Sequence, residues 1–265
     1  MSRRAAAAPL KGGHVGAKGK GKAGRKAAPP AATRAVVVAQ PAPVHIANGT
    51  LEAVKWFALF LMTLDHVNKY LFAHKLPACF ELGRLAMPLF VFVLAYNLAR
   101  PGALAAGAHW RTGKRLAIYG AIACVPYMAL GTVLGGWWPL NIMFALLAAT
   151  AMYGLIEHGG RLQTTLAVAV FAVAGALVEY WWPALLLALA CWLYCKRPTA
   201  GRLAGLVAST ALLWVVNQNL WALAALPVML LAPRVTLRMP RVPHVFYVYY
   251  PAHLALIWAL SKALH

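Results

Sequence analysis

From residue 51 to the carboxyl end, long apolar segments alternate with short loops that contain Gly, Pro, Asn or charged residues. This alternation predicts a series of membrane-spanning helices, although several segments are shorter than the ~20 residues of a full crossing. The breaks at 181–183 and 217–219 are short enough to be tight hairpins, so the expected count is eight or nine. The nine candidate spans are 52–73, 84–99, 115–134, 139–157, 162–180, 182–195, 203–216, 218–232 and 245–262.

Positive charge falls on alternate loops of this series. Three of the remaining loops contain GGWWP, EYWWP and NQN without Lys or Arg, and the first contains only Lys75 and the boundary residue Arg84. Cytoplasmic loops carry excess Lys and Arg, so the pattern predicts nine spans with the amino end cytoplasmic and the carboxyl end periplasmic. The charged loops hold Arg100, Arg111, Lys114 and Arg115, then Arg161, then Lys196, Arg197 and Arg202, then Arg234, Arg238 and Arg241.

The composition supports membrane immersion over a soluble fold. The chain is 62% hydrophobic and 11% charged, whereas soluble domains carry about 25% charged residues. So little polar material cannot solvate the outside of a domain of this size. We therefore expect an all-α, polytopic integral membrane helix bundle in the bacterial inner membrane, with a folded domain at 51–265.

Residues 1–45 differ from the rest of the chain. They are rich in Ala, Gly, Lys and Pro and contain no acidic residue. Such a segment cannot bury enough apolar surface to become ordered, so we predict a disordered cytoplasmic tail. Its basic side chains fit contact with anionic lipid or with nucleic acid phosphates.

Asp65, the only aspartate in the chain, lies in the first predicted span beside His66. It is thirteen residues beyond Glu52, or about 20 Å along a helix, and therefore falls in the outer half of the bilayer. Ionisable residues at such depth are functional candidates. The structural alternative is an ion pair between Asp65 and Lys69, four residues further on, but it leaves His66 unexplained.

Adjacent helix residues point about 100° apart, so Asp65 and His66 each need a partner from another span. Arg84, Asn141 and His253 are predicted at a similar depth. Pro251 interrupts the backbone hydrogen bonds of the last span and predicts a kink. The two tyrosines before it could share the His253 side of the helix, which makes Tyr249 and Tyr250 supporting candidates.

Five segments resemble the TraX family of conjugative systems. They are LEAVKWFALFLMTLDHVNKYLF (51–72), ELGRLAMPLFVFVLAYNLA (81–99), RLAIYGAIACVPY (115–127), PLNIMFALLAAT (139–150) and FYVYYPAHLALIW (246–258). The DH, GRxxxPLF, LN and YPxH elements are specific in combination. The resemblance covers both ends of the membrane region in order, and it does not include residues 1–50.

The resemblance implies an inner-membrane enzyme that transfers an acetyl group from acetyl-CoA to the amino terminus of a pilin subunit, or to another outer amine or hydroxyl. His66 or His253 would then be the general base, Asp65 would hold the base or the substrate ammonium, and Arg84 or Asn141 would stabilise the oxyanion. No metal is implied. The donor phosphates would pair with the inner basic residues Arg100, Arg111, Lys114 and Arg115.

Two other functions use the same residues. A proton-coupled transporter could relay protons through Asp65, His66 and His253, although the chain shows no inverted repeat of discontinuous spans. A non-catalytic assembly factor of a pilus or secretion complex could use the polar cluster to join its helices.

Overall fold

The computed structural model describes residues 42–131, 134–242 and 244–264. Most of the predicted disordered tail, residues 1–41, lies outside these ranges. The backbone N–H of Val44 donates to the carbonyl of Cys195 over 3.0 Å, and Ile46 is buried. The packed region therefore begins slightly before the boundary that we expected at residue 45.

Within the described ranges, the helices form nine segments in the expected order, and the only β-structure is isolated bridges. The all-α fold is thus confirmed. The segments are α1 (Asn48–Leu71), α2 and α3 (Pro77–Gly83 and Ala86–Ala99), α4 (Ala108–Ala129), α5 (Ile142–His158), α6 (Arg161–Leu177), α7 (Trp181–Lys196), α8 and α9 (Ala200–Leu212 and Trp214–Asn217), η1, α10 and η2 (Trp221–Ala224, Ala225–Leu231 and Ala232–Arg234), and α11 (Val245–Leu264).

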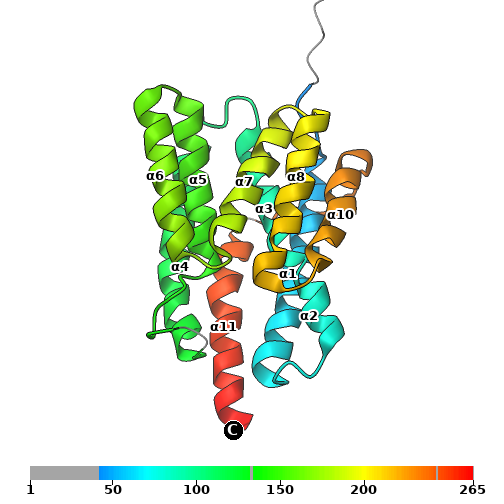
Figure 1. Cartoon of the computed structure of the whole chain (residues 1–265). Coiled ribbons are helices and arrows are strands. Elements are labelled where there is room, and N and C mark those ends of the chain that lie inside the picture. Colours follow the sequence, from blue (N-terminus) through cyan, green and yellow to red (C-terminus); the bar gives the residue numbers. More distant parts are fainter. Residues whose placement is uncertain (1–41, 132–133, 243, 265) are drawn as a thin grey trace, which may run out of the picture. The chain divides into compact units, whose positions relative to one another are not determined.

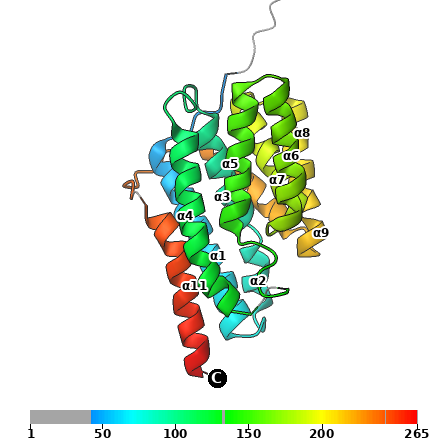
Figure 2. The same cartoon turned by 90° about the vertical axis from the view of Figure 1, so that its left-hand side faces the viewer.

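Helix α3 lies in the core of this bundle. It is apolar on all sides, as its sequence AMPLFVFVLAYNLA shows, and most of its residues are buried, which is the pattern of a helix surrounded by others. It packs against α1 and α7, while α11 packs against α1 and α4 (Figures 1 and 2). The first and last helices are therefore neighbours, and they bring residues 55–66 beside residues 246–253.

The basic loops gather at the end of the bundle where α1 begins. Asn48 accepts a hydrogen bond from Arg100, and Thr50 donates one to the carbonyl of Val235. Lys196 forms an ion pair with Glu157 at the same end. The carboxyl end of α11 lies at the opposite end (Figure 1), as an odd number of helices requires.

Two helical stretches in the described part of the chain, Pro77–Ala99 and Ala200–Asn217, are long and apolar enough to cross a membrane. Four further apolar helices are shorter. The bundle also exposes large apolar side chains on its outer helices, including Ile122 and Val125 of α4, Val168 and Val173 of α6, and Leu256 of α11.

The clearest difference from the predicted spans lies at the start of the second one. A separate short helix, α2, precedes the second span, and the chain turns at Arg84 and Leu85 before α3 begins. Pro88 falls in the first turn of α3, where the missing N–H has no helical partner in any case. Helices α4 and α11 continue through Pro126 and Pro251.

Candidate functional site

Asp65 is paired with Arg84 in the structure. Nη2 of Arg84 donates to Oδ2 of Asp65 over 2.5 Å, and both side chains are only 12% exposed. The guanidinium also donates to the carbonyl of Phe80 and to Oδ1 of Asn217. Lys69 instead lies over the ring of Tyr70. Of the partners considered for Asp65, the structure therefore selects Arg84, which lies on a different helical segment.

Gly83 makes this pairing possible. A Cβ at position 83 would lie 2.4 Å from Cβ of Asp65, a distance that no packed side chain tolerates. The missing side chain lets the end of α2 approach α1 closely enough for the next residue, Arg84, to reach the carboxylate. The GR element of the sequence thus has a structural basis.

His66 and His253 form a hydrogen-bonded dyad. Nδ1 of His66 lies 2.7 Å from Nε2 of His253. The ring centres are 5.0 Å apart and the planes differ by 2°. With the nearest nitrogens at 2.7 Å, this separation means that the rings meet edge to edge in one plane, which is the geometry of a direct N–H···N bond.

The positions of the protons on the two imidazole rings follow from a second hydrogen bond of His253. Nδ1 of His253 lies 2.9 Å from the backbone carbonyl of Tyr249, and a carbonyl can only accept, so this nitrogen carries a proton. In neutral His253 the other nitrogen, Nε2, is then an acceptor, and Nδ1 of His66 must donate to it. Neutral His66 is left with its basic lone pair on Nε2.

The supporting residues fall into two groups. The hydroxyl of Tyr249 is 2.8 Å from Oγ1 of Thr63, and its ring stacks on His253, so it helps to hold the dyad. Asn141 is fully buried and caps α5: its Oδ1 accepts from the N–H of Met143, and its Nδ2 donates to the carbonyl of Gly120. Its polar atoms are used in packing α4 against α5.

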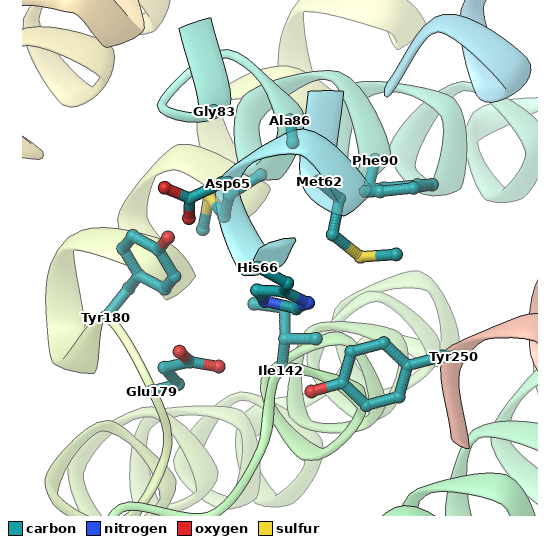
Figure 3. Close-up of a pocket in the computed structure, with 11 residues that line it drawn as sticks. Met62, Asp65, His66, Gly83, Ala86, Phe90, Ile142, Glu179, Tyr180 and Tyr250 are labelled. Atoms are coloured by element: carbon teal, nitrogen blue, oxygen red, sulfur yellow. The ribbon is translucent and has the colours of Figure 1, made fainter. Parts of the chain in front are cut away.

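A small cavity of about 40 Å³ lies beside Asp65 and His66. Figure 3 shows the carboxylate of Glu179 and the hydroxyl of Tyr250 turned toward one another in the space beside His66. Arg84 and Asn141 do not line this cavity. Its walls are Met62, Asp65, His66, Gly83, Ala86, Met87, Phe90, Ile142, Glu179, Tyr180 and Tyr250.

Glu179 and Tyr180 were not among the residues expected at the site. They lie between α6 and α7, in the EYWWP stretch at the outer end of the fifth predicted span, 162–180. The charge of the Glu179 carboxylate interacts with those of Lys69 and Arg84. The signal that could have identified it was composition, since Glu179 is one of only five acidic residues in the chain.

A larger cavity of about 480 Å³ adjoins the first and shares Met62, Phe90, Ile142 and Tyr250 with it. It extends to the end of the bundle where α1 begins. No acidic residue is among its described walls, but five basic side chains are: Lys55, Arg100, Arg111, Arg115 and Arg241. Three of the four predicted donor-binding residues thus share one cavity, and the fourth, Lys114, is exposed outside it.

Among the residues that the structure describes, no group of three or more His, Cys, Asp or Glu side chains is arranged to hold a metal ion. The polar groups at the site are the Asp65–Arg84 pair, the histidine dyad, Glu179 and the two tyrosines on its walls. This is a set suited to binding a cation and moving protons.

Known protein sequences match most of this chain. A model of the family described as TraX protein matches residues 50–261. Protein TraX of Escherichia coli is 34% identical over 174 residues, which span 64% of this chain and 66% of that relative, slightly less than two thirds of its length. No solved structure matches. The matched region contains every element of the site, and the chain belongs to the TraX family.

Proposed function

We propose that this protein is an acyltransferase of the bacterial inner membrane that uses cytoplasmic acetyl-CoA to acetylate an amine, such as the amino terminus of a pilin, on the outer face. The observation that carries the proposal is the pair of adjoining cavities. One is large and basic, the other is small and is lined by His66 of the histidine dyad, and four side chains line both.

The membrane location is supported by the surface of the bundle. Helix α6 has only two buried residues, Ala167 and Gly175, and exposes Leu162, Val168 and Val173. In water such a surface would be an aggregation hazard, whereas in a bilayer it faces lipid. The nine helical segments would each cross once, with the basic end in the cytoplasm.

The large cavity suits the acyl donor. Acetyl-CoA carries several phosphates at one end and a thioester at the other, joined by a long flexible arm. Arg100, Arg111 and Arg115 could pair with the phosphates at the cytoplasmic end. The arm would then extend past Met62 and Phe90, so that the thioester carbonyl enters the small cavity beside His66.

The histidine dyad would supply the general base. The amine nitrogen attacks the thioester carbonyl carbon, and Nε2 of His66 accepts a proton from that nitrogen. His253 stabilises the imidazolium by accepting from Nδ1 of His66, as the third member of a catalytic triad does. The tetrahedral intermediate collapses, the C–S bond breaks, and His66 returns the proton to the leaving thiolate.

The oxyanion of the intermediate needs a donor. Arg84 and Asn141 were the expected donors, but they do not line the small cavity, and both already bind groups of the protein. The hydroxyl of Tyr250, which lines both cavities, is the better candidate. Arg84 would act by fixing Asp65, and Asp65 by shaping the cavity wall beside His66.

The test is co-expression with the cognate pilin, followed by intact-mass measurement of the mature subunit. An acetyl-sized increase should be present with the wild type and absent with the His66→Ala variant. Processed pilin of unchanged mass in the presence of the wild-type protein would exclude pilin acetylation.

A proton-coupled carrier is the second candidate, favoured by the direct hydrogen bond between His66 and His253, through which a proton could pass. Purified protein in liposomes would then move protons in response to a substrate, and Asp65→Asn would abolish that movement. Acetylation without any proton movement would exclude this function.

A further inference from the structure

The segment between α6 and α7 has an unusual backbone. Tyr180 and Trp181 have φ values of 63° and 51°, in the left-handed region, which is sterically unfavourable for a residue other than glycine. Two successive aromatic residues in this conformation require strong support from their surroundings.

The support comes from the residues just before α5. The N–H of Leu140 donates to the carbonyl of Leu177, and the N–H of Glu179 donates to the carbonyl of Leu140, both over 2.8 Å. The two segments thus form a short parallel bridge. This bridge holds Glu179 and Tyr180 against the small cavity.

Glu179 is anchored but forms no ion pair with a described residue, although Lys69 and Arg84 act on its charge from further away. The backbone N–H of Ile142, at the start of α5, interacts with its carboxylate. The ion pairs within the described ranges are Glu52–Lys55, Asp65–Arg84 and Glu157–Lys196, and Glu179 is in none of them. Asp65, the other carboxylate on the cavity wall, is already compensated by Arg84.

We propose that Glu179 is the residue that binds the acceptor: its carboxylate pairs with the protonated primary amine in the small cavity. The walls formed by Met62, Phe90 and Ile142 would hold an apolar chain next to that ammonium. This inference rests on the proposed acyl transfer. It gives the recognition of the acceptor's ammonium group to Glu179, a residue that the family resemblance did not indicate.

The assignment also completes the proton balance. An ammonium must lose one proton before its nitrogen can attack and a second proton during the attack. Glu179 accepts the first proton and becomes a neutral carboxyl. Nε2 of His66 accepts the second and returns it to the thiolate. The products are the amide and the free thiol, and Glu179 then releases its proton to water.

Binding can be measured without turnover. The probes are a short apolar peptide amide with a free α-amino group and the same peptide acetylated at its amino terminus, titrated against the full chain in nanodiscs. The wild type should bind the free peptide about tenfold or more tightly than the acetylated one. Glu179→Gln should lose this preference, and Glu157→Gln, a control at the opposite end of the bundle, should keep it.

A chemical measurement on the wild type removes any dependence on the folding of a variant. An apolar carbodiimide should modify Glu179, as detected by peptide mass spectrometry. The free peptide should protect Glu179 severalfold, and the acetylated peptide should not. Equal binding of both peptides by the wild type, a preference retained in Glu179→Gln, or no protection would each overturn the assignment.

These outcomes are separable from those of the function test. A preference that depends on Glu179, together with pilin of unchanged mass, would reject acetyl transfer and keep the ammonium site. Pilin acetylation together with an unaltered preference in Glu179→Gln would reject the role of Glu179 alone.

Discussion

Nδ1 of His66 lies 2.7 Å from Nε2 of His253, although 187 residues separate the two histidines in the sequence. The carbonyl of Tyr249 fixes the protonated nitrogen of His253, and this directs the basic lone pair of His66 to Nε2. The two histidines, which are equivalent candidates in the sequence, therefore have different roles in the structure.

This difference can be tested by substitution at each position. His66→Ala should lower kcat of acyl transfer by about 10²–10⁴-fold, the usual contribution of a general base. His253→Ala should lower it less. His253→Gln should recover part of the loss, because an amide can accept from His66 and donate to the Tyr249 carbonyl. Equal loss in His253→Gln and His253→Ala would contradict a positioning role.

The Asp65–Arg84 pair should be strongly coupled in the folded protein. Removing one partner leaves a buried charge, so Asp65→Asn and Arg84→Gln should each lower the free energy of unfolding by about 3–5 kcal/mol. The double variant should lose clearly less than the two losses combined. The measurement is a double-mutant cycle in mixed micelles. The more exposed Glu157–Lys196 pair is the control, with a coupling of about 1 kcal/mol or less.

Gly83→Ala should disrupt the contact between α1 and α2. The added methyl group would lie 2.4 Å from Cβ of Asp65, and such overpacking typically costs about 1–3 kcal/mol. Thermal unfolding in detergent measures the loss, and acyl transfer should fall with it. Gly205→Ala in α8 is the matched control, because nothing lies within 4 Å of its added Cβ; a comparable loss there would remove the argument.

Substitutions in the wall of the basic cavity should weaken binding of the acyl donor and leave binding of the acceptor unchanged. Arg111→Ala and Arg115→Ala each remove a cation from its wall, so each should raise KM for acetyl-CoA about tenfold, with KM for the acceptor unchanged. Lys114→Ala, which removes a neighbouring exposed charge outside the cavity, should change KM for the donor less than twofold. Steady-state kinetics with both substrates varied separates these effects.

The topology makes a further prediction. A reporter fused after residue 265 should be active in the periplasm, and one fused after residue 198, between α7 and α8, should be active in the cytoplasm. A cytoplasmic carboxyl end would require an even number of crossings and would reject the nine-span topology.

The order of the helices was predictable from the sequence because apolar runs bounded by short loops are a local signal. Depth along the predicted spans also selected Asp65, Arg84, His66 and His253, which the structure brings together. The depth of a residue in a predicted span does not determine the direction in which its side chain points, however. Asn141 lies beside Ile142 of the small cavity, but its side chain points away from that cavity. It caps α5 and donates to the carbonyl of Gly120 in α4.

Glu179 could not be assigned from the sequence for a different reason. Its position depends on the bridge between Leu140 and Val178, a long-range backbone contact that leaves no periodic pattern in either segment. Likewise, nothing in the local sequence around Gly83 indicates that Asp65 lies against it.

The volume of the small cavity has a consequence for the choice of acyl group. At about 40 Å³, and with a water-sized group needing roughly 10–15 Å³ on the same measure, it has room for about three non-hydrogen atoms. The carbonyl carbon and oxygen of the thioester and the attacking amine nitrogen are three, so the methyl group of an acetyl already reaches the side chains shared with the large cavity. A propionyl or butyryl thioester would have to displace Met62 or Phe90, so the same side chains that join the two cavities would act as a ruler for chain length.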